Sequence, residues 1–442
     1  MQYTSFNFKT LDEVRQKLKD LNAELPLSEN TAVLAEPLKL GGKHSANRIA
    51  IQPMEGCDGT GGGSPDELTV RRYDRFARSG AGLIWFEAVA IAENGRANKR
   101  QLHIHKDNAD DFKRLVSQIK ETSLKENGFE PVLIMQATHS GRYSKPLGTP
   151  QPIIAYNNPL FEKDRPIPKE SIISDDELKA LETKYGETTK LAREAGFDGV
   201  DIKCCHRYLN SELLSAFTRE GEYGGSFENR TRFLANGVRA AAASAGSGFI
   251  ITSRLNIYDG FPYPYGFGAE KTGLGPDFDE PVKLARMLHE DLKIELLDIT
   301  MGNPYVNPHV NRPADFQGYD PAENPLEGVA RMYAGIREIS GRFPGLKVVS
   351  SGTTYLRQFS PNLAAGAVEQ GYCSLAGFGR MAFAYPGFAK DLLAEGKINA
   401  GKCCITCGKC SELMRAGSVS GCVIRDRDVY LPIYRKAVGG GE

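Results

Sequence analysis

The chain has 442 residues, with 55 basic and 55 acidic side chains, so its formal net charge at pH 7 is zero. This balance excludes the strongly basic surface of a nucleic-acid-binding protein, and we expect neither nucleic acid nor membrane as a partner. No apolar run is long enough to span a bilayer, and the N-terminus has no signal-peptide pattern. Nine cysteines without an export signal are typical of a reducing compartment, so we expect a cytoplasmic protein.

An amphipathic pattern over residues 11–25 predicts a peripheral helix. Short apolar runs then recur, and helical patterns such as those over residues 110–126 and 174–195 lie between them. The second helical pattern opens with Ser174-Asp-Asp-Glu177, which has the form of a capping box. The runs that we interpret as strands are 49–54, 82–88, 132–136, 199–203, 249–254, 295–300, 347–350 and 373–376.

Eight strand-then-helix units predict an α/β fold, a (β/α)8 barrel, with a doubly wound open sheet as the alternative. We divide the chain into an N-terminal helical extension (residues 1–35), the barrel (36–398) and a cysteine-rich segment with a C-terminal tail (399–442). Residues 138–173 and 259–279 are long connections that follow the carboxyl ends of strands, where barrel active sites assemble. We interpret both as lids over a pocket for a flat, apolar ligand, or else as packed rim loops. The aromatic residues of the connection 259–279 are Phe261, Tyr263, Tyr265 and Phe267.

Five of the nine cysteines lie between Cys403 and Cys422. Cys404, Cys407 and Cys410 follow one another at x2 spacing on a glycine-bearing turn, and Cys422 comes eleven residues later. Several closely spaced cysteines plus one more are typical of iron–sulfur clusters, whereas a structural zinc site usually has two separated C-x2-C pairs. The spacing therefore favours a [4Fe–4S] cluster over zinc and predicts a redox enzyme. A disulfide framework is typical of small secreted domains and is not expected here.

Polar residues also stand where the predicted strands end. The amide of Gln136 could pair with a pyrimidine-like heterocycle, and the guanidinium of Arg254 could stabilise negative charge on the N1–C2=O edge of a reduced flavin. Ser351-Gly352 and Gly379-Arg380 follow the last two strands, where barrels of this type usually bind phosphate. Each residue could instead be a core amide, an ion-pair partner or a turn, but together they indicate an FMN site.

The fourth predicted strand runs into Lys203-Cys-Cys-His206-Arg-Tyr208. Lysine and histidine can donate hydrogen bonds to a substrate carbonyl, and tyrosine can deliver a proton. We therefore interpret Lys203, His206 and Tyr208 as catalytic. The two intervening cysteines are expected to be small packed residues.

The chain resembles the Old Yellow Enzyme family of flavin barrels, and within it the iron–sulfur branch that includes bacterial 2,4-dienoyl-CoA reductases and trimethylamine dehydrogenase. The most specific match is the run Tyr223-Gly-Gly-Ser-Phe-Glu-Asn-Arg230 together with the cysteine spacing, and the resemblance covers about residues 36–425. The other matching segments are 47–54, 87–88, 136–142, 196–202 and 379–380.

The resemblance implies a TIM barrel that binds FMN and a [4Fe–4S] cluster. Tyr208 aligns with the family's proton-donating tyrosine, and His206 with the second residue of its carbonyl-binding pair. The implied cluster ligands are Cys404, Cys407, Cys410 and Cys422. The implied FMN contacts are Pro53, Met54, Ala88, Gln136, Arg254, Gly352, Gly379 and Arg380. We add Glu55 and Ser351 to this set of FMN-binding residues.

Two residues depart from the family pattern. Lys203 replaces the usual first histidine of the pair, and Glu55 stands after Pro-Met, near the flavin O4, where the family often has Thr, Cys or His. The chain also stops soon after the cysteines, without the FAD- and NAD(P)H-binding domains of larger relatives. We therefore expect a separate donor, a flavoprotein or a ferredoxin-like carrier, with NAD(P)H acting only through it. A homo-oligomeric assembly is left open.

These observations lead to the hypothesis of an FMN- and [4Fe–4S]-dependent ene-reductase. It would reduce the C=C bond of an α,β-unsaturated carbonyl compound, bulky or planar, such as a steroid or bile-acid-like enone or an enoyl thioester. The alternatives are an amine or alcohol dehydrogenase that passes electrons out through the cluster, and a non-catalytic electron-transfer or redox-sensing subunit. A zinc-stabilised barrel without redox activity is the remaining alternative.

Overall fold

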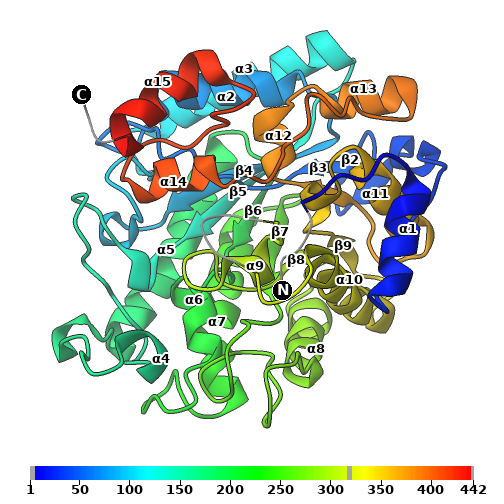
Figure 1. The fold of residues 1–442 in the computed structure, drawn as a ribbon. Helices are drawn as coiled ribbons and strands as arrows, with labels where there is room; N and C mark the ends of the chain where they lie inside the picture. The colour runs from blue at the N-terminus through cyan, green and yellow to red at the C-terminus, as the bar shows by residue number, and fades with distance from the viewer. Residues whose placement is uncertain (1–4, 316–320, 440–442) are drawn as a thin grey trace.

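The computed structural model describes residues 5–315 and 321–439, which form an α/β barrel (Figure 1). The ends of the predicted extension and tail, residues 1–4 and 440–442, lie outside the described residues. Eight parallel strands form one sheet in the order β10-β3-β4-β5-β6-β7-β8-β9, and a bridge from Val349 to Leu375 closes it into a cylinder. The predicted (β/α)8 barrel is thus confirmed, in place of the open sheet. The strands are β3 (Ile49–Ile51), β4 (Leu83–Ala90), β5 (Val132–Thr138), β6 (Gly199–Ile202), β7 (Ile250–Asn256), β8 (Leu296–Thr300), β9 (Lys347–Val349) and β10 (Ala376–Phe378).

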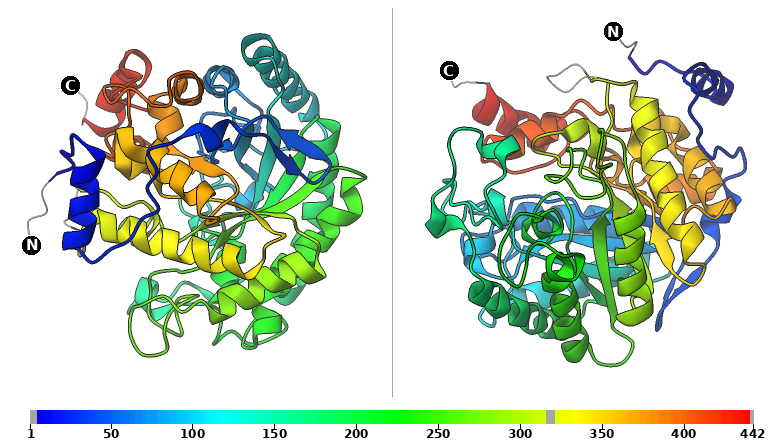
Figure 2. Two further views of the ribbon diagram at one scale, coloured as in Figure 1. Left: turned by 90° about the vertical axis from the view of Figure 1, so that its right-hand side faces the viewer. Right: turned by 90° about the horizontal axis from the view of Figure 1, so that it is seen from below.

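Helices cover the outside of the barrel, as the two further views in Figure 2 show. The predicted capping box forms: the Ser174 hydroxyl accepts a hydrogen bond from the Glu177 N–H, and the Glu177 carboxylate accepts one from the Ser174 N–H. The long helices are α2 (Glu67–Ala77), α3 (Ala109–Asn127), α5 (Asp175–Glu194), α7 (Phe227–Ala245), α8 (Asp279–Arg286), α10 (Pro325–Arg342), α11 (Ser360–Glu369) and α13 (Phe388–Glu395). Shorter helices lie in the connections: α4 (Pro159–Glu162), α6 (Leu209–Leu214), α9 (Pro308–Asn311) and α12 (Arg380–Ala384).

The barrel interior is apolar at the amino ends of the strands. Its packed residues include Leu83, Trp85 and Val349, and Leu40 of the hairpin β1 (Leu38–Leu40) and β2 (Lys43–Ser45) closes this end. Strands buried on both faces explain why the sequence shows continuous apolar runs and not an alternation of polar and apolar residues. Because this end is sealed, polar side chains gather at the carboxyl ends.

Several predicted boundaries differ from the structure, those of the N-terminal helix and of the eighth strand among them. The N-terminal helix α1 covers Leu11–Asp20, because Asn22 adopts a left-handed conformation (φ 49°) that ends it before residue 25. The eighth barrel strand, predicted at residues 373–376, lies at Ala376–Phe378. Pairing with β3 decides this register, since Ala376 is opposite Ile49. The end of the helix is thus local, whereas the register of the strand is set by a partner distant in sequence.

The cysteine-rich segment packs against the barrel beside α2 (Figure 1). Its two helices are α14 (Lys409–Arg415) and α15 (Arg427–Val438). Asp426 forms ion pairs with Arg71 and Arg75 of α2. The Ser420 N–H donates to the carbonyl of Gly56, 2.7 Å away, on the loop after β3. The segment is thereby held next to the carboxyl ends of the strands.

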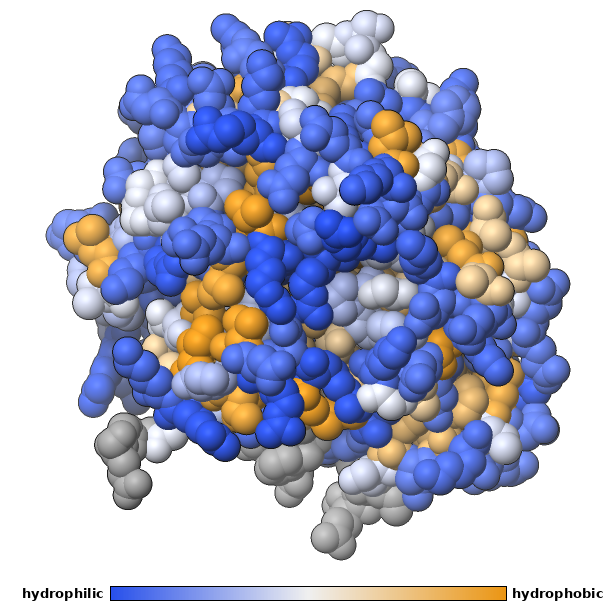
Figure 3. Space-filling model, turned by 90° about the horizontal axis from the view of Figure 1, so that it is seen from above, coloured by the Kyte–Doolittle hydropathy of each residue, from blue (hydrophilic) through white to orange (hydrophobic). Residues whose placement is uncertain are grey.

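Within the described residues, no helix has both the length and the apolar composition that a bilayer crossing requires. On the face shown in Figure 3, apolar residues form small groups between hydrophilic ones.

A buried ion cluster anchors the loop that follows β3. Arg72 of α2 pairs with Asp58 and with Glu87 of β4, all three side chains being at most 4% exposed. Glu87 also accepts a hydrogen bond from the Gly56 N–H at 2.8 Å. Burial raises the pKa of Glu87 to about 7, opposed by Arg72. The loop carrying residues 53–56 is therefore fixed from behind.

We expect Arg72→Met to destabilise the protein by about 3–5 kcal/mol, because it leaves two buried carboxylates without their cation. Chemical denaturation of both proteins measures the difference. Arg114→Met, which removes an exposed pair with Asp111, should cost less than about 1 kcal/mol. Equal costs for the two substitutions would contradict the role of the cluster.

Candidate functional site

A cavity opens at the carboxyl ends of the strands and offers about 990 Å³ of space, its open side included. We call it the central cavity. Its walls come from the ends of β3, β5, β6 and β7 and from the loops after β8, β9 and β10. The expected residues that line it are Pro53, Met54, Glu55, Gln136, Lys203, His206, Tyr208, Arg254, Ser351, Gly352, Gly379 and Arg380. Ala88 is the expected flavin contact that does not line it: Ala88 is fully buried, and its carbonyl accepts from the Gln101 side-chain amide at 3.1 Å.

Gln136 and Arg254 are oriented by the buried carboxylate of Asp201. The Gln136 side-chain N–H donates to Asp201 at 2.6 Å, and the Arg254 backbone N–H donates to it at 2.7 Å. Trp85 Nε1 donates to the same carboxylate at 2.8 Å. Burial raises the pKa of Asp201 to about 6, while the bond from Gln136 opposes the shift. The amide of Gln136 is therefore held in one orientation at the cavity.

A second buried carboxylate, Asp298, lies behind Arg254. Arg254 Nε is 3.2 Å from Asp298 Oδ2, and the Gln52 side-chain N–H donates to Asp298 Oδ1 at 2.9 Å. The same Gln52 nitrogen donates to the Ser351 hydroxyl at 2.7 Å. Burial raises the pKa of Asp298 to about 7, opposed by Arg254. This network joins β3, β7, β8 and β9 beneath the cavity and sets the position of the Arg254 guanidinium.

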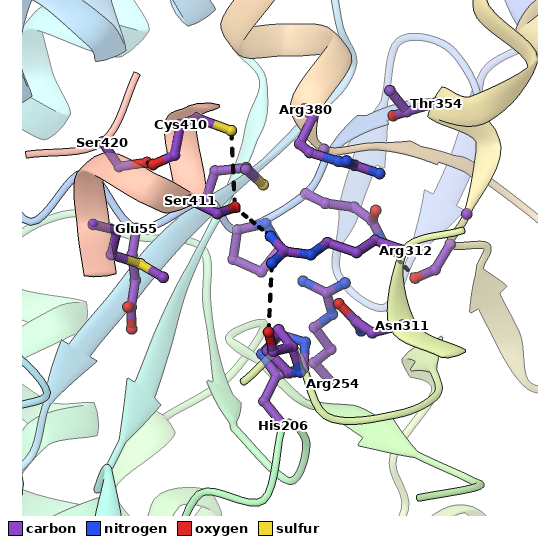
Figure 4. Close-up of a pocket in the computed structure, with 18 of the residues that line it drawn as sticks. Glu55, His206, Arg254, Asn311, Arg312, Thr354, Arg380, Cys410, Ser411 and Ser420 are labelled. Atoms are coloured by element: carbon purple, nitrogen blue, oxygen red, sulfur yellow. Dashed lines mark hydrogen bonds between the residues drawn. The ribbon is translucent and has the colours of Figure 1, made fainter. Parts of the chain in front are cut away.

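The loops after β9 and β10 offer groups suited to a phosphate. Gly352 has a left-handed conformation (φ 89°), which favours glycine. A Cβ at Gly379 would come within 3.2 Å of the Met54 sulfur, so this position favours glycine. Arg380 Nη1 is buried and has no hydrogen-bond partner among the described residues. Figure 4 shows Arg380 on the wall of this cavity. A buried guanidinium nitrogen without a hydrogen-bond partner, on a loop with glycines, fits the phosphate of FMN.

We expect Arg380→Met to weaken FMN binding at least about 10-fold, since it removes a charge-assisted bond, and to leave riboflavin binding nearly unchanged because riboflavin has no phosphate. Fluorescence titration of the flavin-free protein with both compounds measures this. Arg337→Met on the outer helix α10 is the matched control. An equal loss for FMN and riboflavin would contradict a phosphate contact.

The turn after β6 holds its residues in an unusual backbone conformation. His206 (φ 64°) and Arg207 (φ 54°) both lie in the left-handed region, which costs energy for residues other than glycine. Arg207 is fully buried and donates to Asp259 at 2.9 Å and to the carbonyl of Tyr265 at 3.0 Å. These bonds hold the turn, so that Lys203, His206 and Tyr208 reach the same cavity.

The aromatic loop 259–279 does not cover the cavity, contrary to the lid interpretation. Phe261 packs edge-on against Phe161, and the two rings lie 5.8 and 4.9 Å from the Arg207 guanidinium. Phe267 is in the hydrophobic core, and Tyr263 contacts Phe217. None of the four aromatic residues lines the central cavity as described. The buried cation of Arg207 explains this packing, which corresponds to the rim-loop alternative.

Tyr208 lies at the centre of a hydrogen-bonded group. Its hydroxyl is 2.8 Å from that of Tyr305 and donates to Glu55 Oε1 at 3.4 Å. Lys203 Nζ lies 3.9 Å from the centre of the Tyr208 ring and 3.8 Å from Glu55 Oε1. Tyr143 stacks on Tyr305 with ring centres 3.9 Å apart. Tyr305 and Tyr143 thus form one aromatic wall next to the proposed proton donor.

Burial changes the ionisation of these groups. It raises the pKa of Glu55, which Lys203 and the bond from Tyr208 oppose. It raises the pKa of Tyr208 well above its usual value, with a further contribution from Glu55. It lowers the pKa of His206, helped by Lys203 and Arg254, so the imidazole is neutral at pH 7. The Nε2 atom of His206 is buried without a hydrogen-bond partner among the described residues.

The four expected cluster ligands surround a second cavity, the cysteine cavity. Cys404, Cys407, Cys410 and Cys422 all line it, with about 380 Å³ of space between its walls. Backbone N–H groups point at two of the sulfurs: Thr406 at Cys404 (3.4 Å) and Arg425 at Cys422 (3.3 Å). Such bonds stabilise thiolates that hold a cluster.

The four cysteine sulfurs are not gathered as ligands of a single metal ion. In the described part of the chain, no three His, Cys, Asp or Glu side chains converge as a single-ion site. Cys403 is buried, its thiol donates to the Asn399 carbonyl at 3.3 Å, and it does not line the cysteine cavity. Cys410 and Arg380 line both the cysteine cavity and the central cavity. The two cavities therefore share a wall.

Several lining residues were not anticipated from the sequence. Tyr305, Asn311 and Arg312 come from the loop after β8, and Ser411 and Ser420 from the cysteine-rich segment. Figure 4 shows Arg312 extending across the cavity toward Ser411, to which it donates a hydrogen bond. The signal that could have revealed this loop is the position of Gly302-Asn-Pro-Tyr305 directly after a strand end.

Residues 33–271 match the model of the NADH:flavin oxidoreductase / NADH oxidase family, which is more than half of the chain. The chain belongs to this family. It is 33% identical over 191 residues to an NADPH dehydrogenase of Clostridium acetobutylicum, covering 42% of this chain and 53% of the relative. It is 31% identical over 275 residues to an NADPH dehydrogenase of a Geobacillus species, covering 61% and 73%. The match thus spans about half the length of the first relative.

Solved structures share the fold of this flavin oxidoreductase. A 2-naphthoyl-CoA reductase complex superposes with a TM-score of 0.73 at 19% identity, over 90% of this chain and 57% of that one. A morphinone reductase superposes with a TM-score of 0.60 at 22% identity, over 83% and 92%. These likenesses show the barrel. Family membership supports FMN as the cofactor.

Proposed function

We propose that this family member is an ene-reductase that uses FMN and a [4Fe–4S] cluster. The observation that carries the proposal is that Lys203, His206 and Tyr208 line the same cavity as Gln136, Arg254 and Arg380. Donors for a carbonyl oxygen, a proton donor and the groups suited to a flavin thus meet in one place. The name morphinone reductase supports reduction as the direction, whereas a histamine dehydrogenase of Rhizobium sp. 4-9, with a TM-score of 0.69 at 21% identity over 90% of this chain, keeps amine oxidation as the second candidate.

Gln136, Arg254 and Arg380 would hold FMN by its pyrimidine edge and its phosphate. When bound, reduced FMN supplies a hydride for the β-carbon of an unsaturated carbonyl compound. Lys203 and His206 donate hydrogen bonds to the carbonyl oxygen and stabilise the negative charge that develops there. Neutral His206 serves this purpose with one ring N–H, and its buried ring has space for a ligand partner.

Tyr208 delivers a proton from its hydroxyl to the α-carbon. Its raised pKa makes it a strong base once deprotonated, so it must be reprotonated before the next turnover. Glu55 is within hydrogen-bond distance of the Tyr208 hydroxyl and also lines a cavity open to solvent. We include Glu55 in the proposal as the group that returns the proton to Tyr208.

The cysteine cavity would hold the cluster with Cys404, Cys407, Cys410 and Cys422. When bound, the cluster supplies one-electron transfer, and its shared wall with the central cavity places it next to the FMN site. A separate flavoprotein or ferredoxin as donor remains our proposal. Oxidation of an amine is the second candidate, and it is less favoured because a cationic substrate would meet Lys203 and Arg312 in a described lining whose one carboxylate is Glu55.

The test is anaerobic stopped-flow absorbance. Chemically reduced protein is mixed with enones and enoyl thioesters, and, as a comparison, oxidised protein is mixed with amines. Reoxidation of the flavin band near about 450 nm by an unsaturated carbonyl compound is the expected result. Bleaching of the oxidised flavin by an amine would overturn the proposal in favour of a dehydrogenase. NADPH mixed with oxidised protein tests direct reduction, which would contradict the separate donor.

We expect Glu55→Gln to lower steady-state turnover ~10²-fold, because the amide cannot return a proton. Burial raises the pKa of Glu55 and so keeps it protonated to higher pH, and wild-type turnover should fall as pH rises through that raised pKa. The titratable groups around the same carboxyl group are Lys203, Tyr208, Tyr305 and Cys57. A pH profile of kcat measures this, and the variant should lack the descending limb.

Glu121→Gln, on the exposed face of α3, is the control and should keep the wild-type profile. A Glu55→Gln profile parallel to that of the wild type would show that the proton reaches Tyr208 by another route.

A further inference from the structure

A third cavity lies next to the central cavity and shares a wall with it. This outer cavity has about 1370 Å³ of space, its open side included, and Glu55, Tyr305 and Met414 line both cavities. Its inner wall therefore includes Tyr305, on which Tyr143 stacks. Tyr305, whose hydroxyl lies 2.8 Å from that of Tyr208, is thus part of the wall of both cavities.

Three cations from three separate parts of the chain line the outer cavity. Lys99 comes from the connection after β4, Lys145 from the connection after β5, and Arg415 from the end of α14. Within residues 5–315 and 321–439, none of the three forms an ion pair with a carboxylate. The one acidic residue in the described lining is Glu55, at the inner end. Three positive charges and one carboxyl group thus line the described part of the outer cavity, and Lys99 and Arg415 are exposed to solvent.

A buried arginine fixes the backbone at two of these cations, and the third is held by a separate hydrogen bond. Arg96, which is 2% exposed, donates to the carbonyl of Lys99 at 2.7 Å, and its own carbonyl accepts from the Lys145 N–H at 2.7 Å. Arg415 donates to the carbonyl of Pro304 at 3.0 Å, next to Tyr305. The three side chains therefore start from positions set by the fold and not from loose loops.

We propose that the outer cavity binds the anionic group of an unsaturated substrate, so that the substrate has a planar reactive part near Tyr208 and a carboxylate or phosphate at Lys99, Lys145 and Arg415. This inference rests on the proposed function for the chemistry and adds the substrate class. Carboxylates and phosphates share the negative oxygen atoms that lysine and arginine bind. A carboxylate tail and a phosphate tail differ in length and charge, and the experiment distinguishes the two.

The experiment uses two matched pairs of probes with the complete, cluster-loaded protein. One pair is 4-carboxybenzylideneacetone and its methyl ester; the other is cinnamoyl-CoA and its N-acetylcysteamine thioester. We expect the charged member of one pair to have a KM at least about 10-fold lower than its neutral partner, with similar kcat, and the advantage to shrink as ionic strength rises. The acid pair identifies a carboxylate tail, and the thioester pair identifies phosphate.

The variants are Lys99→Gln, Lys145→Gln and Arg415→Gln, singly and together, with Lys190→Gln on the outside of α5 as the control. Each single change should raise the KM of the charged probe about 2–5-fold and the triple change should abolish its advantage, while the neutral probe and kcat stay the same. Equal KM values within both pairs, or variants that leave the charged probe unchanged, would overturn the inference. If these variants raised only the KM of NADPH, the cations would bind NADPH and not the substrate, which would also overturn the inference.

A binding measurement separates this inference from the proposed function. The saturated acid, 4-(3-oxobutyl)benzoate, and its methyl ester are titrated against the oxidised flavin spectrum. Tighter binding of the acid that depends on the three cations would support the anionic site even if no probe reoxidised the flavin, a result that would reject only the ene-reductase.

Discussion

Tyr208→Phe should reduce the rate of C=C reduction by ~10²–10⁴-fold, because it removes the hydroxyl that delivers a proton to the substrate. The phenyl ring keeps the packing of the buried side chain and its contact with Lys203 Nζ, 3.9 Å from the ring centre. FMN content and the rate of flavin reduction by dithionite should therefore stay at the wild-type level. Single-turnover reoxidation of the reduced flavin by an enone measures the effect.

Tyr223→Phe is the matched control. Tyr223 is equally buried, but its hydroxyl donates to Glu182 on α5, at 2.8 Å, outside all three cavities. It should retain nearly full activity at some cost in stability. Wild-type activity in Tyr208→Phe would reject the tyrosine as proton donor and would favour a non-catalytic redox subunit. A parallel loss in both variants would point to a general effect on folding.

Cys407→Ser and Cys422→Ser should each lower bound iron from about four atoms per chain to well below one, since a [4Fe–4S] cluster needs all four thiolates. Iron and acid-labile sulfide are measured after anaerobic reconstitution. Retention of FMN in the same samples shows that the barrel is folded, because the groups suited to FMN are on different loops. Transfer of electrons from an external one-electron donor to the flavin should be lost.

Cys403→Ser is the control, since its thiol donates to the Asn399 carbonyl and does not line the cysteine cavity. It should keep the full iron content. One equivalent of zinc and no iron in the wild-type protein would reject the cluster. Loss of iron in Cys403→Ser together with its retention in Cys404→Ser would exchange the roles of the two neighbouring cysteines.

The conformation of the loops could not be predicted from the sequence, because it depends on residues distant in sequence. Tyr208 and Tyr305 are 97 residues apart and share a hydrogen bond only because β6 and β8 end at the same rim of the barrel. The aromatic loop 259–279 reads as a lid by composition, yet it packs on Arg207, a residue whose burial no local pattern indicates. Loop conformation depends on such distant partners, and propensity does not encode them.

The amino-acid sequence by itself determined the class of fold, the order of the strands and most of the residues at their carboxyl ends. Apolar runs must be buried and parallel strands must alternate with helices, so Gln136, Lys203 and Arg254 could be placed at one rim before any coordinates. The tertiary structure alone decided that Glu55, Tyr208 and Tyr305 form one hydrogen-bonded group, that the cysteine and central cavities share a wall, and that Lys99, Lys145 and Arg415 meet at an outer cavity. These arrangements join side chains from separate loops, and only the closure of the barrel brings those loops together.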